Sequence, residues 1–285
     1  MRISGEGSAP GSCGELAQGQ LISGETFLLS LPVDLWSQVH VELDASFSGV
    51  VCEQSNKEKT HLTVTRLLAD LGHTSLGARV QVQSDIPVGK SMASSTADIT
   101  AACRAVGAAL DAEITPELIS SIAKQIEPSS GIMYPGVVCY DHIDGRLIEA
   151  LGAMPHVRIL VLDTDGEVDT LAYNQNPIAY SKEERELCEE AFQKVRLGVR
   201  SQYLPLVGDG ATRSARINQT HLYKPQLEEC ITLAKQHGAH GVCIAHSGTL
   251  LGLIFGPQDE AIMIAQQAVR EQFGEQVKTF VTRSI

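Results

Sequence analysis

Residues 84–98, SDIPVGKSMASSTAD, form the segment that most limits the folds open to this chain. An alternating strand pattern, ARVQVQ, runs directly into it, and a helix pattern follows, so the segment joins a strand to a helix. Its GKS at 89–91 resembles the end of a Walker phosphate loop, which needs a further glycine five positions before Gly89. That position holds Ser84, and Pro87 removes a backbone N–H from a loop whose N–H groups would bind phosphate. The Walker architecture is therefore disfavoured.

The start of the following helix offers a different phosphate site. Ser94, Ser95 and Thr96 stand in the expected first turn of a helix over 94–110, where free N–H groups and the positive end of the helix dipole attract anions. These hydroxyls can bind phosphate oxygens or a magnesium ion. They can equally well do no more than cap the helix. The residues alone leave both interpretations open.

Hydrophobic periodicity predicts the remaining elements. In the first half, strands are expected within 27–43 and over 78–83, a helix over 58–71 that ends at Gly72, and a helix from Pro116 to about 125 with Thr115 as its N-cap. In the second half, the pattern predicts a strand over 157–163, a helix that begins with a capping box and ends near 199, helices over 225–237 and 258–272, a hairpin of 242–246 with 250–255, and a last strand over 277–282. The capping box consists of Ser181 and Glu184. Because strands and helices do not strictly alternate, we expect an α+β fold of two lobes, with a boundary near residue 153.

Composition narrows the class of partner. The 285 residues carry a formal net charge of -12, which argues against nucleic acid and anionic membranes and favours a small substrate. Seven scattered cysteines without a C-x-x-C pair indicate reduced thiols rather than disulfides or a zinc site. With neither a signal-peptide pattern nor a long apolar run, the sequence predicts a cytoplasmic protein.

Four segments resemble the motifs of the GHMP kinases, and they occur in the family's order along nearly the whole chain. They are APGSCGELAQG (9–19), IPVGKSMASSTAD (86–98), IEPSSGIMYPGVVCYDH (126–142) and HGVCIAHSGTLLGLIF (240–255). The resemblance implies the GHMP kinase fold, with a ribosomal protein S5 domain 2-like N-terminal lobe over 1–152 that binds ATP and a ferredoxin-like C-terminal lobe over 153–285. Within the superfamily, these segments look most like the L-threonine kinases of adenosylcobalamin biosynthesis. The reaction so implied moves the γ-phosphoryl group of MgATP to the L-threonine hydroxyl.

The same resemblance implies roles for individual residues. A catalytic set would comprise Ser95, Glu127, Lys90 and Ser130, of which Ser95 and Glu127 would also bind Mg²⁺. ATP would lie against Pro87, Val88, Gly89, Lys90, Ser91, Met92, Ala93, Ser94, Ser95, Thr96 and Ala97. The acceptor would contact Ser12, Cys13, Gly14, Glu15, His246, Ser247 and Gly248, with Glu15 as the partner of the substrate ammonium. A purely structural explanation remains open for three of these residues. Lys90 can be a solvated loop lysine, Glu127 a helix-end residue and His246 a structural histidine. Covalent catalysis by Cys13 is disfavoured because no Cys-His-Asp arrangement is visible, and Asp34 suits a turn or cap better than the cleft.

Two positions depart from the family pattern. Where threonine kinases of this type tend to carry EPTD, this chain has Glu127, Pro128, Ser129 and Ser130, and a serine cannot act as a base at neutral pH. Catalysis would then rest on proximity and metal, on another carboxylate such as Asp141, or be impaired. Ser91 stands where the phosphate loop of the family usually has glycine, and Met92 where it usually has leucine.

Two other functions remain to be weighed. One is a homoserine kinase or another hydroxy-amino-acid kinase. Discrimination of threonine from serine would rest on one methyl group, worth about 1–3 kcal/mol in a fitted pocket that the sequence does not show. The other is a nucleotide-binding or ligand-binding protein that has kept the fold and lost catalysis, which the two departures would favour. The sequence does not fix the oligomeric state, and a homodimer is one assembly open to it.

Overall fold

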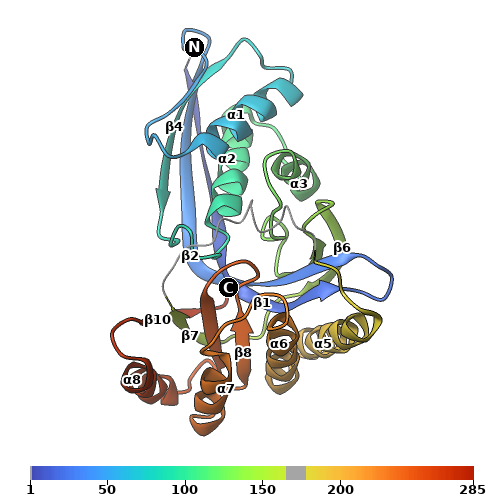
Figure 1. Cartoon of the computed structure of the whole chain (residues 1–285). Helices are drawn as coiled ribbons and strands as arrows, with labels where there is room; N and C mark the ends of the chain where they lie inside the picture. Colours follow the sequence, from blue (N-terminus) through green and yellow to red (C-terminus); the bar gives the residue numbers. More distant parts are fainter. Residues whose placement is uncertain (1, 165–177) are drawn as a thin grey trace.

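The computed structural model describes residues 2–164 and 178–285. Two long strands run through the whole molecule, and the other elements are arranged around them (Figure 1). The strands are β1 (Ile3–Gln20), β2 (Thr26–Asp44), β3 (Val50–Cys52), β4 (Gly77–Ser84), β5 (Val137–Asp141), β6 (Arg146–Gly152), β7 (Arg158–Asp163), β8 (Gly241–Ile244), β9 (Leu250–Phe255) and β10 (Lys278–Arg283). The helices are α1 (Glu58–Asp70), α2 (Ser94–Leu110), α3 (Pro116–Lys124), α5 (Lys182–Arg200), α6 (Leu204–Asn218), α7 (Leu227–Gln236) and α8 (Ala261–Phe273).

The strands form one 10-stranded sheet in the order β10-β7-β9-β8-β1-β2-β4-β3, with β5 joining β2 to β6. β1 and β2 pair antiparallel along their length, with register shifts between Pro10 and Ala17. A single pair, Glu15 with Ile244, connects β1 to β8. The sheet of the N-terminal half therefore continues into the sheet of the C-terminal half at the point where β1 is irregular.

Helices cover the sheet in two groups. Figure 1 shows α1 and α2 against the upper part of β1, β2 and β4, and α5 to α8 gathered at the opposite end of the molecule. One large hydrophobic core extends from β1 and β2 to α1, α2, α5 and α6, and a second lies between the C-terminal strands and α7 and α8. These apolar contacts hold both groups of helices on one sheet. They therefore determine where the loop before α2 meets the C-terminal elements.

The α+β class is confirmed, and so are most of the predicted elements. The helix of residues 94–110 has the predicted bounds. Thr115 accepts from the Leu118 N–H as the N-cap of α3, and Ser181 and Glu184 form both bonds of the capping box of α5. The hairpin β8–β9 also forms as expected. Within the described residues, no helix is long and apolar enough to span a membrane.

Two large elements, β1 and α6, were not predicted, and both contain glycines that look like loop residues. A Cβ on Gly7 of β1 would lie 2.2 Å from the Ala101 carbonyl oxygen of α2. A Cβ on Gly208 of α6 would lie 2.1 Å from the His240 carbonyl oxygen. These glycines permit close packing of elements rather than turns, which local sequence patterns do not distinguish.

Candidate active site

A cavity of about 320 Å³ lies where the loop before α2 meets β1, the residues after α3 and the loop after β8. Its lining residues are Ser12, Glu15, Leu28, Lys59, Val88, Gly89, Ser91, Ala93, Ser94, Ser95, Thr96, Glu127, Pro128, Ser129, Ser130, His142, His246 and Ser247. Segments from all four quoted motifs therefore meet in one place.

The backbone of the loop is shaped to bind an anion. Gly89, Ser91 and Ala93 have φ values of 75°, 56° and 57°, so left-handed residues occur at every second position. Such alternation turns neighbouring N–H groups toward a common centre, the arrangement called a nest. Ala93 is also the N-cap of α2 and makes no side-chain cap bond, so Ser94 and Ser95 do not serve as its cap. The nest, the uncapped N-terminus of α2 and the hydroxyl groups of Ser94 and Ser95 all face the cavity. Together they are suited to binding phosphate.

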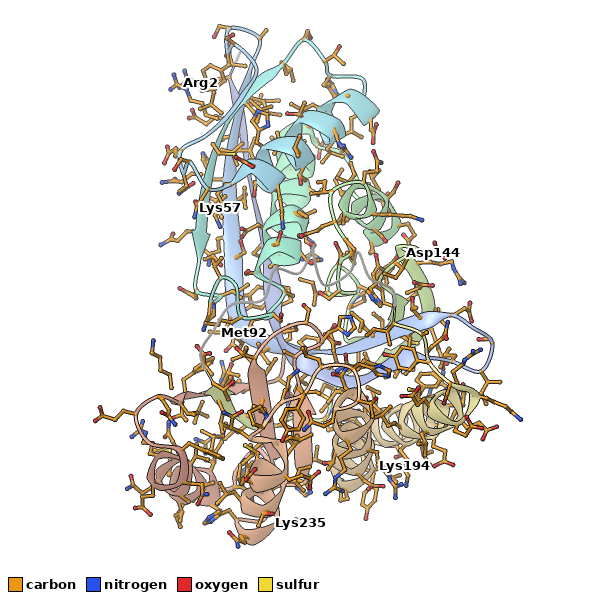
Figure 2. All side chains as sticks on the ribbon, in the orientation of Figure 1. Arg2, Lys57, Met92, Asp144, Lys194 and Lys235 are labelled. Carbon is orange, nitrogen blue, oxygen red and sulfur yellow. The ribbon has the colours of Figure 1, made fainter. Side chains whose placement is uncertain are left out.

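Three contacts hold this loop in place. The fully buried Met92 anchors it, and its carbonyl oxygen accepts a 2.9 Å hydrogen bond from the Ser12 N–H of β1. Figure 2 places Met92 at the foot of α2, beside the two long strands. The Lys90 Nζ lies 3.0 Å from Asp163 Oδ1 at the end of β7, and Ser91 Oγ lies 3.2 Å from Ser247 Oγ. The loop is thus tied both to the N-terminal core and to C-terminal residues.

A carboxylate with one free oxygen faces the loop. Glu127 is 5% exposed, and its Oε2 forms an ion pair with Lys59 of α1. Its buried Oε1 has no hydrogen-bond partner in the described part of the chain. Ser95 lines the same cavity. A carboxylate and a hydroxyl are the hard oxygen ligands that Mg²⁺ takes when phosphates and water complete its shell, so this donor set fits the ion.

The segment after Glu127 contributes hydroxyls rather than a second carboxylate. Ser129 Oγ donates to the Glu127 carbonyl oxygen at 3.1 Å, whereas the buried Ser130 Oγ has no partner among residues 2–164 and 178–285. Asp141, considered above as a substitute base, lies outside the cavity lining. Its Oδ1 accepts from Thr26 Oγ1 at 2.7 Å and from two N–H groups of the β5–β6 turn, so that suggestion was wrong. Asp34 likewise pairs with Trp36 and Arg283, away from the cavity.

Glu15 brings a buried carboxyl group to the other side of the cavity. Burial raises its pKa to about 8, an effect that the neighbouring Ser30 hydroxyl partly offsets. Its Oε2 has no hydrogen-bond partner in the described residues. A cation placed against this oxygen would supply the missing partner and favour the ionised carboxylate. Glu15 therefore has the chemistry to bind a positively charged group.

Two neutral histidines close the cavity. The rings of His142 and His246 meet edge to face with centroids 4.9 Å apart. Burial lowers the pKa of His142 to about 4 and holds that of His246 well below its ordinary value. The Nδ1 of His246 is hydrogen-bonded to the Oε1 of Gln18 on β1. Both rings therefore stay uncharged near neutral pH and can act as hydrogen-bonding groups.

The structure gathers most, but not all, of the predicted site residues. Those outside the lining are Pro87, Lys90, Met92, Ala97, Cys13, Gly14 and Gly248. Among them, Cys13 is buried in the hydrophobic core, and Lys90 is ion-paired rather than solvated. Leu28, Lys59, Pro128, Ser129 and His142 line the cavity without having been predicted. Of these, His142 could have been predicted, because it ends the quoted motif of residues 126–142. Lys59 lies in no quoted motif, so the sequence did not point to it.

Fold and site together define a kinase that phosphorylates a small molecule, and sequence comparison agrees. The family model for the GHMP kinases N terminal domain matches residues 59–139, and that for the GHMP kinases C terminal domain matches residues 190–275. The chain belongs to the GHMP kinase family. The L-threonine kinases of Citrobacter freundii and Salmonella typhimurium are 30% and 31% identical to it, each over 86% of this chain and over 84% and 81% of their own lengths.

Solved structures show the same fold. Homoserine kinase from Cytophaga hutchinsonii superposes with a TM-score of 0.76 at 18% identity, over 100% of this chain and 95% of that one. A further structure, in complex with MVAPP, AMPPCP and magnesium, superposes with a TM-score of 0.71 at 16% identity, over 100% of this chain and 98% of that one. At these identities the likeness concerns the fold. It confirms the GHMP kinase fold expected from the motifs, whereas the division at residue 153 stays a prediction.

Proposed function

We propose that the protein transfers the γ-phosphoryl group of MgATP to the hydroxyl of L-threonine, giving O-phospho-L-threonine for the nucleotide-loop linker of adenosylcobalamin. The observation that carries the proposal is a single cavity in which an anion-binding nest faces the buried carboxyl group of Glu15, whose Oε2 has no hydrogen-bond partner among the described residues. The relatives named L-threonine kinase support the choice of acceptor.

The nucleotide would lie across two adjoining cavities. The triphosphate fits the nest of residues 89–93 and the N-terminus of α2. A second cavity, lined by Asn56, Lys57, Glu58, Lys59, Thr60, Val88, Ser94, Ser95 and Asp98, shares four residues with the first and offers room for the nucleoside. Val88 is 65% exposed between them and would pack on the base. Lys90, which now pairs with Asp163, lies in the same loop and remains a candidate for neutralising phosphate charge.

Glu127 and Ser95 would hold the magnesium ion. When bound, Mg²⁺ neutralises charge on the phosphate oxygens. Lys59, which holds Oε2 of Glu127, leaves Oε1 available for the ion and adds a positive charge beside the phosphates. Transfer then rests mainly on holding the acceptor oxygen in line with the γ-phosphorus.

The acceptor would lie between the loop and the floor formed by β1 and β2. The ammonium group of L-threonine would bind Glu15, while the side-chain hydroxyl faces the phosphates. Leu28 is paired with Gln18 across β1 and β2 and is an aliphatic lining residue near Glu15. It is therefore placed to contact the methyl group that distinguishes threonine from serine, a contact worth about 1–3 kcal/mol.

A panel of acceptors tests the function. The purified protein is incubated with MgATP and L-threonine, L-serine or L-homoserine, and products are detected by mass spectrometry. We expect phosphothreonine to form with the highest kcat/KM. A preference for L-homoserine would mean that L-homoserine, and not L-threonine, is the acceptor. Nucleotide binding without phosphorylation of any hydroxy amino acid would indicate a binding protein with the same fold.

A further inference from the structure

A group of buried polar side chains lies behind His246, next to the cavity rather than in its lining. Gln18 of β1, Asn218 at the end of α6 and Lys224 in the following loop are 2%, 2% and 4% exposed. Burial of three such side chains in one neighbourhood is unusual unless they are hydrogen-bonded. Their polar atoms therefore need an explanation.

Hydrogen bonds connect this group to the site. Gln18 Oε1 is bonded to the ring of His246, which lines the cavity, and the Gln18 N–H donates to Ser214 Oγ of α6 at 2.9 Å. Asn218 is one helical turn beyond Ser214 on the same face of α6. The main chain of Lys224 is fixed through both its N–H and its carbonyl oxygen by the Gln219 side chain, at 2.7 and 2.9 Å.

The same side chains carry hydrogen-bonding groups that nothing satisfies. Lys224 Nζ, Gln18 Nε2 and both polar atoms of Asn218 have no partner among the residues that the structure describes. Burial lowers the pKa of Lys224 to about 8, so the amine is still mainly protonated at pH 7. Burial, His142 and the charge of Lys224, in this order, lower the pKa of His246. The positive charge of Lys224 therefore acts on a residue that lines the cavity.

A buried ammonium without a counter-ion destabilises the folded protein, because the desolvation of the charge is not compensated. The group contains one ammonium and two amide NH₂ donors and lacks a carboxylate of its own. This set matches a carboxylate, which can accept several charge-assisted hydrogen bonds at once. The arrangement is thus incomplete until an anion enters.

We propose that Lys224, Gln18 and Asn218, which adjoin the cavity at His246, bind the carboxylate of an acceptor whose ammonium group binds Glu15. The acceptor is then a zwitterionic amino acid held at both charged ends, with its hydroxyl directed to the phosphate loop. This inference rests on the proposed function and deepens it, because it assigns recognition of the amino-acid carboxylate to named residues, of which Gln18 lies in the first quoted motif and Asn218 and Lys224 lie in none. An amino alcohol, which has the ammonium group and lacks the carboxylate, should therefore be a poor acceptor.

The test compares L-threonine with L-threoninol, which keeps the ammonium and the hydroxyl and lacks the carboxylate. In Lys224→Met, the ratio of kcat/KM for L-threonine to that for L-threoninol should fall about 10- to 100-fold, the size expected for a charged hydrogen bond. The fall should come from the KM for L-threonine. Lys235→Met, at an exposed position of α7, is the matched control and should keep the wild-type ratio. Thermal unfolding should show Lys224→Met to be at least as stable as the wild type, because it removes an unpaired buried charge.

The outcomes separate this inference from the proposed function. An equal loss for both acceptors, or an unchanged ratio, would overturn the carboxylate site. If Lys224→Met does not fold, Asn218→Leu replaces it, and a selective loss for L-threonine is again required. If the wild type phosphorylates no hydroxy amino acid, the proposed function fails. The inference is then decided by calorimetric titration, in which Lys224→Met must weaken binding of L-threonine more than binding of L-threoninol.

Discussion

Burial of the Glu15 carboxyl group raises its pKa, and the pH dependence of unfolding should show this effect. In the folded protein the pKa of Glu15 is about 8, against 4.5 for an exposed glutamate. Between about pH 5 and 8 the unfolded chain has lost this proton while the folded one keeps it. The free energy of unfolding attributable to Glu15 therefore falls as pH rises, by up to about 1.4 kcal/mol per pH unit.

Glu15→Gln removes that titration. We expect the variant to gain stability over the wild type progressively from pH 5 to pH 8, as measured by urea unfolding at several pH values. At pH 8 its KM for L-threonine should be higher, because the ammonium loses its counter-ion. A constant difference in stability across this range would contradict the raised pKa.

Ser130 should show whether catalysis lacks a carboxylate. Its hydroxyl is buried in the cavity without a partner in the described residues, three positions after Glu127. We expect Ser130→Asp to raise kcat, by up to about 100-fold, since a positioned base contributes about that much. Ser130→Asn has the same shape without the charge and is the control. A folded Ser130→Asp protein with an unchanged or lower kcat would indicate that transfer relies on positioning and metal alone.

Ser91 adopts a backbone conformation that suits glycine. Its φ of 56° is left-handed and costs a residue with a Cβ about 1–2 kcal/mol. We expect Ser91→Gly to tighten ATP binding or speed transfer, measured by titration with ATP and by kcat. Ala93→Gly relieves a similar φ of 57° and keeps the Ser91–Ser247 contact, so it shows how much of the gain belongs to strain. Weaker nucleotide binding by Ser91→Gly would refute the expectation.

At the scale of elements, the sequence predicted what local patterns encode. The N-cap Thr115, the capping box of Ser181 and Glu184 and the apolar stripe of α2 all concern residues within a few positions of one another. The site was predictable where a motif carries it, as at Glu127. Lys59 was not, because it reaches Glu127 only after α1 has packed beside α2 and α3. Gln18 and Lys224 were missed for the same reason, as their proximity depends on how α6 lies across β1.

The glycines of β1 are the clearest element-scale test. We expect Gly7→Ala to destabilise the protein by about 1–3 kcal/mol, because the new Cβ would lie 2.2 Å from the Ala101 carbonyl oxygen and push α2 away from β1. The free energy of unfolding in urea measures this. Ser4→Ala, at an exposed position of the same strand, should stay within about 0.5 kcal/mol of the wild type. Equal effects of the two substitutions would mean that α2 does not pack as closely as described.

At the scale of the whole molecule, β1 and β2 bind the two halves together. β2 pairs with β4 in the upper part of the sheet and with β5 in the lower part, while β1 reaches β8 through Glu15. The isolated bridge between Val33 and Ser284 and the ion pair between Asp34 and Arg283 add contacts with the C-terminal end. The loop before α2 contributes the ion pair between Lys90 and Asp163. Loss of either half would therefore expose apolar surface and unpaired strand edges on the other.

We accordingly expect residues 1–285 to unfold in one cooperative transition, even though the sequence predicts a boundary between two lobes near residue 153. In differential scanning calorimetry, the calorimetric enthalpy should equal the van't Hoff enthalpy. MgATP should move the single peak to higher temperature without splitting it, because binding to the folded state stabilises the whole unit. Arg283→Ala removes one connection between the halves and serves as the comparison, with a lower midpoint and the same enthalpy ratio. Two resolved peaks in the wild type would instead make residues 153–285 an independent folding unit, joined to the N-terminal half only by docking.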